Sequence, residues 1–300
     1  MTVLALDIGG TTARGALMSR DGQVLARHTT PTGDRDPGLH ATRRVAEHLV
    51  AVAGDRGLTV VALGAGFPEY VDREGRLTAH EVLDWDRQPG DLLADLAPTV
   101  VVESDVRCGA VGELHRSGGT WRDFVYVSLG TGLSHTFVCD GTVHRGARGE
   151  AIALGELPVP TEADTYRTET MESFASGTGL ARRYTERTGR GVADGARSVV
   201  ALASEGDRAA EEILTSAGIA LGHACSQLVS LFDPEAIVLG GGLGTVAGTL
   251  RGALLAAYAR ATAGRPSPPP IVPSALGADA GLVGAGHLAW SVAEQHGGRR

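Results

Sequence analysis

The sequence predicts an α/β protein built from two similar halves. A glycine- and threonine-rich turn joins two apolar strands at 7–12, and a second such turn follows another apolar strand at 129–132. Strands and helical patterns alternate after each turn, which is typical of α/β folds. A chain of 300 residues with 43% hydrophobic content is long enough for two domains. The repeat predicts an internal duplication whose two phosphate loops face each other across a cleft.

In the first half, the apolar run Val3–Leu6 forms a strand that ends at Asp7, and the turn leads into a second strand ending at Leu17. The next elements are expected from apolar spacing and turn residues. They are a hairpin turn at 21–22, a strand at 24–26, a helix over 39–53, a strand at 60–63, a loop at 64–68, a short helix over 92–96, a strand at 100–102 and a helix from 106 to about 114.

The second half restarts the pattern with a strand over 124–128, which leads into the second glycine turn. The remaining expected elements are a strand at 136–138, a hairpin turn at 140–141, long helices over 171–187 and 208–231, a strand at 236–239, a proline-rich connector at 265–270 and a final helix from 279 through 290. The strand at 236–239 runs directly into three glycines, Gly240, Gly241 and Gly242.

The turn at Asp7–Thr12 has the composition of a phosphate-binding loop. Gly9 and Gly10 let the backbone approach an anion closely, and the hydroxyls of Thr11 and Thr12 add donors. Asp7 can hold water on a Mg²⁺ ion that bridges phosphates. The glycines join two strands instead of opening a helix, so the turn differs from dinucleotide-binding and Walker loops. Taken alone, the motif favours phosphate binding only narrowly over an ordinary glycine turn.

Composition excludes several classes of protein. A net charge of −8 with interspersed acids and bases argues against nucleic acid or an anionic membrane as partner. Every basic residue is arginine, so lysine-based Schiff-base, Walker or protein-kinase chemistry is excluded. The three cysteines (108, 139 and 225) have no paired spacing, which indicates reduced thiols in a cytoplasmic protein. No signal peptide or membrane span is expected.

Taken in order, these motifs resemble those of the ROK sugar kinases, a branch of the hexokinase–actin fold, over essentially the whole chain. Asp7–Thr12 resembles the first phosphate motif, and Leu129–Gly132 resembles the second. Asp233–Gly242 resembles the adenosine motif, and 279–286 resembles the start of the closing helix. Glu103–Ser104–Asp105, followed by 109–113, resembles the segment that carries the catalytic aspartate.

The resemblance implies a two-lobed actin-like ATPase (RNase H-like) fold with a central cleft. The expected small lobe is 1–106 plus 287–300, and the expected large lobe, with nucleotide-binding elements, is 107–286. It also implies ATP and Mg²⁺ as cofactors, and a homodimer. Asp105 would be the general base that accepts a proton from the 6-hydroxyl of a hexose-like substrate. The alternative for Asp105 is a purely structural helix cap.

Further residue roles follow from the same resemblance. Asp7 would orient Mg²⁺ and its waters. The phosphates would bind to two sets of residues, Gly9, Gly10, Thr11 and Thr12 in the first turn and Gly130, Thr131 and Gly132 in the second. Gly240, Gly241 and Gly242 would let the adenosine lie on bare backbone.

The chain departs from the family at the expected sugar and zinc sites. In the family's Glu-x-Gly-His motif, Ala153 takes the Glu position and Glu156 the His position. An offset that keeps Glu150 as the sugar-binding glutamate stays open. The stretch 163–170 contains no cysteine where the family has three, so no structural zinc is expected. Ser104 replaces an asparagine, Glu69 replaces a glycine, and Glu172 keeps its family place.

The expected substrate pocket consists of Glu69, Ser104, Asp105, Glu156 and Glu172. Its added carboxylates favour a cationic substrate, because a buried charge is costly unless it is paired. An amino sugar fits, and divergent ROK-like kinases of antibiotic pathways in GC-rich bacteria make kanosamine the leading candidate. Alternatively, Glu69 and Glu156 face solvent or pair with an arginine, Arg148 or Arg167.

Other functions stay open. A zinc-free glucokinase and a C7-cyclitol kinase are alternatives within the same enzyme class. A non-catalytic sugar sensor is the alternative from a different class. A ROK repressor is not expected, because its helix-turn-helix would precede the first phosphate motif, and here only two residues and the strand come before Asp7.

Overall fold

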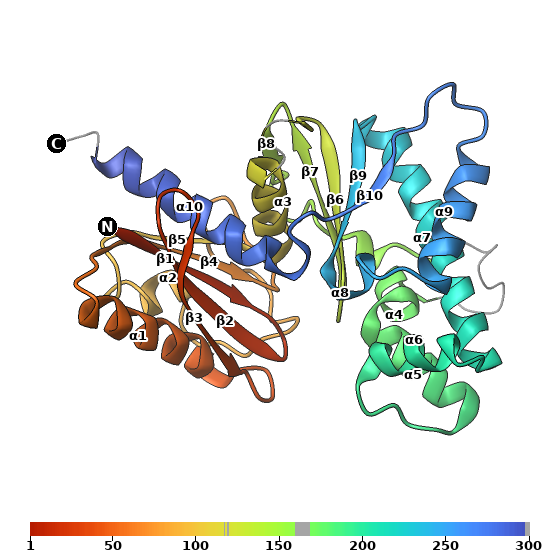
Figure 1. Ribbon diagram of the computed structural model, residues 1–300, viewed down its shortest axis with the longest axis horizontal. Helices are drawn as coiled ribbons and strands as arrows, with labels where there is room; N and C mark the ends of the chain where they lie inside the picture. The colour runs from red at the N-terminus through yellow and green to blue at the C-terminus, as the bar shows by residue number, and fades with distance from the viewer. Residues whose placement is uncertain (117, 119, 160–168, 298–300) are drawn as a thin grey trace. The chain divides into compact units, whose positions relative to one another are not determined.

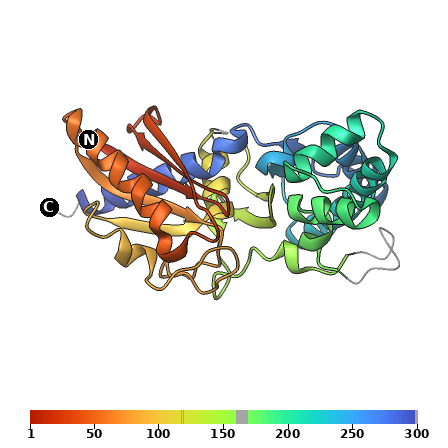
Figure 2. The same cartoon turned by 90° about the horizontal axis from the view of Figure 1, so that it is seen from below.

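The computed structural model describes residues 1–116, 118, 120–159 and 169–297, and it divides the chain into two compact units. The first unit contains Met1–Thr120, Val143–Ile152 and Ala278–Arg300, and the second contains Trp121–Thr142 and Ala153–Gly277 (Figures 1 and 2). The boundaries of these units differ from those of the two lobes expected from the sequence. The expected limits at 106 and 287 would cut helix α3 (Asp105–Arg116) and helix α10 (Ala280–Gly297), which pack against each other within the first unit.

The first unit is a five-stranded sheet in the order β3-β2-β1-β4-β5. Its strands are β1 (Thr2–Ile8), β2 (Thr12–Met18), β3 (Val24–Pro31), β4 (Val60–Phe67) and β5 (Val100–Ser104). Strands β1, β4 and β5 run parallel, whereas β2 and β3 form an antiparallel meander beside β1. Two short helical segments, η1 (Pro37–Leu39) and α2 (Pro89–Leu92), lie in the connections.

Helices cover both faces of this sheet. Because side chains alternate along a strand, β1 sends Leu4, Leu6 and Ile8 into one apolar core and Val3 and Ala5 into another. The first core is closed by α1 (His40–Asp55), and the second is closed by α3 and α10 (Figure 1). Strand β1 is therefore buried along its whole length, which fixes the position of the turn that follows it.

The second unit contains the sheet β10-β9-β6-β7-β8, whose last strand continues into the first unit. Its strands are β6 (Phe124–Leu129), β7 (Leu133–Cys139), β8 (Thr142–His144), β9 (Ala236–Gly240) and β10 (Ile271–Pro273). Its helical segments are η2 (Leu154–Glu156), α4 (Met171–Ala175), α5 (Gly177–Thr188), α6 (Gly195–Ser204), α7 (Arg208–Phe232), α8 (Gly241–Gly244) and α9 (Thr249–Ala261); η3 (Gly277–Asp279) follows β10.

Helix α7 is the central helix of the second unit's core and packs against α9. Among the described residues it alone is long and apolar enough to cross a membrane, but 61% of its apolar stretch is buried inside the protein. That burial is the ordinary state of a core helix.

Several elements differ from those expected. The segment 64–68 was expected as a loop, but β4 continues through Phe67. Gly64 lies where α10 crosses the sheet, and a Cβ atom there would be 2.0 Å from the carbonyl oxygen of Ala285. Gly64 therefore permits α10 to pack closely against β4 and does not mark a turn. The expected helix over 171–187 is two helices that meet at Ser176, whose side chain caps the second.

Candidate active site

Three acidic residues lie at or just beyond the carboxyl ends of the three parallel strands of the first unit. Asp7 is the sixth residue of β1, Glu69 comes just after β4, and Asp105 directly follows β5. Parallel strands end at the same edge of a sheet, and open α/β sheets bind ligands at that edge. Asp7 and Glu69 both act electrostatically on the Asp105 carboxyl, in keeping with this shared edge.

Asp7 is buried at the start of the glycine turn and pairs with Arg14, which lies opposite it on β2. Burial raises the pKa of the Asp7 carboxyl, while the Arg14 guanidinium opposes this shift. Arg14 also donates to the carbonyl oxygen of Ala278 at 2.8 Å. Helix α10 starts against the same carboxylate, since a Cβ atom on Gly281 would lie 2.9 Å from its Oδ1 atom.

The turn after Asp7 is held by three hydrogen bonds, and some of its backbone donors stay unused. The N–H of Gly9 donates to the Thr12 carbonyl and the Thr32 hydroxyl donates to the Gly10 carbonyl, each at 2.9 Å, and the Thr32 N–H donates to the Thr11 carbonyl at 3.0 Å. The N–H groups of Gly10 and Thr11 donate to no group in the described part of the chain. Two unused backbone donors in succession, beside a buried carboxylate, can receive phosphate oxygens.

Asp105 is a half-buried residue at the start of α3, and its Oδ1 atom accepts the N–H of Val106 at 2.6 Å. Burial, followed by the negative charge of Asp7, raises the pKa of its carboxyl to about 7. The Val106 hydrogen bond and Arg107 act in the opposite direction, and Glu69 raises the pKa further. A carboxyl group tuned in this way can exchange a proton near neutral pH.

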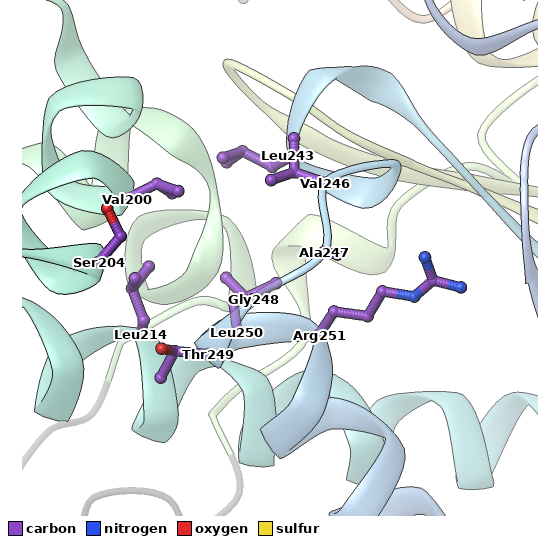
Figure 3. A pocket seen from close by; sticks show the side chains of 10 residues that line it. All are labelled: Val200, Ser204, Leu214, Leu243, Val246, Ala247, Gly248, Thr249, Leu250 and Arg251. Carbon is purple, nitrogen blue, oxygen red and sulfur yellow. The ribbon is translucent and has the colours of Figure 1, made fainter.

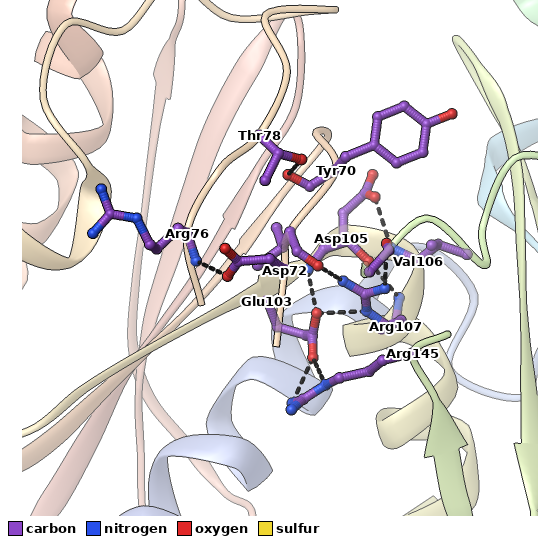
Figure 4. A network of polar contacts seen from close by, with 12 residues as sticks. Tyr70, Asp72, Arg76, Thr78, Glu103, Asp105, Val106, Arg107 and Arg145 are labelled. Carbon is purple, nitrogen blue, oxygen red and sulfur yellow. Dashed lines mark hydrogen bonds and ion pairs between the residues drawn. The ribbon is translucent and has the colours of Figure 1, made fainter. Parts of the chain in front are cut away.

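A cluster of charges that the sequence did not reveal lies beside Asp105, with Glu103 and Arg107 buried and Arg145 partly exposed (Figure 4). Glu103 accepts bonds from Arg107 Nε at 2.5 Å and from Arg145 at 2.7 Å, and Arg107 is completely buried. Glu103 lies in β5 and Arg107 in the first turn of α3, so the four-residue spacing of ion pairs within one helix does not apply to the first pair. Nothing local in the sequence indicated Arg145. The Ser104 hydroxyl is buried next to them and accepts the N–H of Arg107 at 3.4 Å.

Glu69 contacts backbone N–H groups, whereas the sequence predicted a contact with the substrate. Its carboxylate is buried and accepts the N–H groups of three consecutive residues, Glu81, Val82 and Leu83, at 2.7–2.8 Å. Val82 in turn lies against the glycine turn, since a Cβ atom on Gly10 would be 2.9 Å from its Cγ1 atom. Glu69 thus organises the loop that supports Gly10. The Glu69 carboxylate is therefore already engaged and is not an uncommitted charge for a cationic substrate.

The glycine turn of the second unit is clamped by the segments that follow it. Gly177 N–H donates to the Gly130 carbonyl at 2.8 Å, and Thr178 donates to the Thr131 carbonyl. Glu172, an exposed residue in the first turn of α4, accepts the Leu133 N–H at 2.9 Å. The N–H groups of Thr131 and Gly132 donate to no other group in the chain as far as the structure describes it. The second turn therefore offers the same kind of donors as the first.

The three glycines at the end of β9 have different structural roles. A Cβ atom on Gly240 would meet the Tyr126 hydroxyl at 2.0 Å, and Gly241 has a positive φ of 75°. Gly242 is exposed and has open space around its Cα atom. The packing of the unit thus requires the first two glycines, whereas Gly242 is the one that leaves room for a ligand.

A pocket of about 90 Å³ in the second unit is lined in part by Leu243, the residue that follows Gly242 (Figure 3). Its walls are mainly apolar, with the polar side chains of Ser204, Thr249 and Arg251 among them. The pocket was not anticipated from the sequence, because helices α6 and α9, which supply part of its lining, were not expected.

The remaining predicted positions belong to the second unit. Glu156 is exposed at the end of η2. A Cβ atom on its neighbour Gly155 would lie 2.5 Å from the Leu133 carbonyl and 3.0 Å from Glu172 Cβ, so this segment adjoins Glu172. Most of the stretch 163–170 lies outside the described residues, and the expected loss of zinc stays a prediction. Within the described residues, no three His, Cys, Asp or Glu side chains are grouped to hold a metal ion.

Two mixed α/β units with these sheets define an actin-like ATPase fold. A sequence model of the ROK family matches residues 3–292, so the chain belongs to the ROK family. It is 27% identical to a glucokinase of Halalkalibacterium halodurans, over 97% of this chain and 95% of the relative. It is 28% identical to an N-acetylmannosamine kinase of Escherichia coli, over 83% of this chain and 86% of the relative.

A solved structure gives the same picture. A ROK family glucokinase from Streptomyces griseus, in complex with glucose and AMPPNP, superimposes with a TM-score of 0.79 at 26% identity. The match covers 97% of this chain and 100% of that one. The predicted family and fold class are thereby confirmed.

Proposed function

We propose that the protein is an ATP-dependent kinase that phosphorylates a hydroxyl group of a hexose-like sugar. The observation that carries the proposal is the Asp105 carboxyl, whose pKa is raised to about 7 at the strand edge it shares with Asp7. A base with a pKa near the working pH is well suited to take a proton from an alcohol, a contribution of about 10²–10⁴-fold. The similarity to glucokinases supports a sugar as the acceptor and ATP as the donor.

The residues present fit Mg-ATP. The unused N–H groups of Gly10, Thr11, Thr131 and Gly132 would receive phosphate oxygens. Mg-ATP supplies the phosphoryl group and neutralises the charge that develops during transfer. Asp7 would hold the metal's water molecules, which requires its carboxylate to be shared with or released by Arg14.

The second unit would bind the rest of the nucleotide. Gly242, with open space around its Cα atom, would lie against the ribose. The adjoining apolar pocket at Leu243 would lie near the base, whose flat apolar faces suit such walls. Gly240 and Gly241 would support this site by letting β9 and α8 pack closely against β6.

At the acceptor end, we propose the primary 6-hydroxyl of the sugar as the nucleophile and Asp105 as its base. Ser104, Glu156 and Glu172 are proposed to contact other hydroxyl groups. A neutral hexose such as glucose is the leading substrate, because the Glu69 carboxylate already receives three backbone N–H groups. The exposure of Glu156 and Glu172 keeps an amino sugar such as kanosamine as the second candidate.

The test is ADP release from Mg-ATP with glucose, glucosamine, kanosamine, N-acetylmannosamine and a C7-cyclitol in parallel. Asp105→Asn should lower kcat by about 10²-fold or more. Asp55→Asn, at an exposed aspartate at the end of α1, should leave turnover unchanged. ³¹P NMR of the product should show phosphate on the primary carbon.

Sugar binding without ADP release would overturn the proposal and indicate a sugar sensor. Turnover with kanosamine well above glucose would restore the amino-sugar assignment. The family resemblance also leads us to propose a homodimer, which light scattering of the purified protein would measure directly.

A further inference from the structure

Arg107 is a fully buried arginine with all of its nitrogen atoms engaged, two residues after Asp105 on α3. Its Nε donates to Glu103 at 2.5 Å, one terminal nitrogen donates to the Gly149 carbonyl at 2.9 Å, and the other donates to the Val71 carbonyl at 2.5 Å (Figure 4). Arginine is almost never fully buried unless it is paired. This side chain therefore has a specific function in the first unit.

The two carbonyls belong to segments far apart in the sequence that come into contact beside α3. Gly149 has a φ of 85°, and a Cβ atom there would lie 2.0 Å from the Val71 carbonyl oxygen. Val71 follows Glu69 by two residues, and Glu69 is one of the carboxylates that act on Asp105. A single guanidinium thus joins the end of β5, the segment after β4 and the 143–152 segment.

Stability alone does not account for such a group. Apolar residues of similar volume usually stabilise a core as well as a buried ion pair does. A guanidinium differs in that its donors are fixed in a plane, so that it sets the directions of three acceptors at once. The effect of Arg107 is therefore expected in the geometry of the residues next to it.

The charges around Asp105 point the same way. Of the described groups that act on its carboxyl, Asp7 on β1 and Glu69 after β4 are acids, and Arg107 on α3 is the cation. The buried Cys108 thiol, also on α3, interacts with Asp105 and is held neutral because burial raises its pKa. Arg107 therefore counters the two acids that disfavour the ionised form of Asp105.

We propose that Arg107 is a positioning residue for Asp105, which fixes the start of α3 against the Val71 and Gly149 backbones and supplies the cation that favours the basic form of Asp105. The inference rests on the proposed function for its kinetic consequences, while its structural consequences can be measured without turnover.

Three variants separate the possibilities. Arg107→Met removes the charge and the fork of donors, but Glu103 keeps Arg145 at 2.7 Å and is not left unpaired. Arg107→Lys keeps the charge, although an ammonium group cannot reproduce the planar fork. Arg145→Met is the matched control, because it removes the other partner of Glu103 and leaves the Val71 and Gly149 bonds in place.

The first measurement is the pKa of the Asp105 carboxyl by ¹³C NMR, assigned by the loss of its signal in Asp105→Asn. We expect Arg107→Met to raise this pKa by roughly half a unit or more, and Arg107→Lys to restore it. Arg145→Met should leave it unchanged. The second measurement is kcat and KM, with kcat of Arg107→Met expected to fall about 10–100-fold while KM for the sugar changes little.

An Arg107→Met protein that only unfolds at a lower temperature, with the pKa of Asp105 and kcat both unchanged, would show that Arg107 is purely structural. If Arg107→Met does not fold, the kcat of Arg107→Lys decides between the two roles. A wild-type kcat in Arg107→Lys would show that the planar fork of donors is not needed. A wild-type protein without turnover would refute the proposed function and leave the NMR result to decide the positioning role.

Discussion

Arg14 pairs with Asp7 across the first two strands, at the point where the chain enters the glycine turn. The pair places a cation next to a buried carboxylate in a chain without lysine. The Arg14 guanidinium therefore opposes the effect of burial on the Asp7 carboxyl, and its side chain remains about one-third exposed.

Replacement of this arginine should destabilise the first unit. Arg14→Met leaves the Asp7 carboxylate buried without its ion-pair partner, which should cost about 1–3 kcal/mol of unfolding free energy at pH 7. Urea unfolding measures the loss. Arg20→Met, at an exposed pair with Glu294, is the control and should change stability by less than about 1 kcal/mol. Equal effects of the two variants would contradict the burial argument.

Asp105 should cost stability at neutral and alkaline pH. The pKa of its carboxyl in the folded chain is about 7, well above the ordinary value of about 3.9 for an aspartate in an unfolded chain. Below pH 4 both folded and unfolded chains hold the proton, whereas between pH 4 and 7 only the unfolded chain releases it. Stability therefore falls through this range and stays reduced above it. Asp105→Asn should be more stable than wild type at pH 8 by about 2–4 kcal/mol. Denaturant unfolding of wild type and Asp105→Asn at pH 4 and 8 measures this difference. Equal stability of the two proteins at pH 8 would contradict a raised pKa for Asp105.

The same ionisation should appear in turnover. Because the base must be deprotonated, kcat/KM for the sugar should fall tenfold per unit below about pH 7. A pH–rate profile at subsaturating sugar measures this limb. A profile that stays flat down to pH 5 would show that another group, or none, accepts the proton.

Glu69→Gln should affect structure and not substrate choice. The Glu69 carboxylate has two oxygen atoms that together accept three N–H groups, whereas the amide of Gln has only one acceptor oxygen. We therefore expect the free energy of unfolding to fall by about 1–3 kcal/mol. The ratio of kcat/KM for glucosamine to that for glucose should stay within twofold. If Glu69 pairs with the ammonium group of a substrate, this ratio would instead fall tenfold or more.

Two glycines should respond to alanine with opposite signs. Gly64→Ala forces a Cβ atom to within 2.0 Å of the Ala285 carbonyl and should destabilise by about 1–3 kcal/mol or more. Gly54, inside α1 and exposed, has open space around it, so Gly54→Ala should stabilise by about 0.5–1 kcal/mol. Thermal unfolding of both variants measures the difference. A stable Gly64→Ala protein would contradict the close packing of α10 on β4.

Sequence patterns were sufficient for the features that depend on neighbouring residues. Apolar runs identified most strands, and the glycine–threonine turns identified both candidate phosphate loops. The parallel order of β1, β4 and β5, which brings Asp7 and Asp105 to one edge of the sheet, was not among these predictions. Gly64 was misinterpreted because a glycine in a turn and a glycine under a helix look alike in sequence.

Features that depend on distant contacts could not be read from the sequence in the same way. The position of Glu69 depends on three backbone N–H groups more than ten residues away, so that its charge appeared available. The cluster of charges at Glu103 needs Arg145, Gly149 and Val71, none of which is adjacent to it in the chain. Local periodicity contains no information about such partners.

The first unit is assembled from three stretches of chain, and its last helix, α10, is made only after residue 279. Until then α3 is the only helix of this core that covers the face of β1 and β4 carrying Val3, Ala5 and Ala62. During synthesis at about 5–20 residues per second, the part of this apolar face that α10 covers would stay open for many seconds after the strands emerge from the ribosome. The second unit's long segment, 153–277, is complete before α10 exists, so the unit that begins the chain is expected to finish folding last.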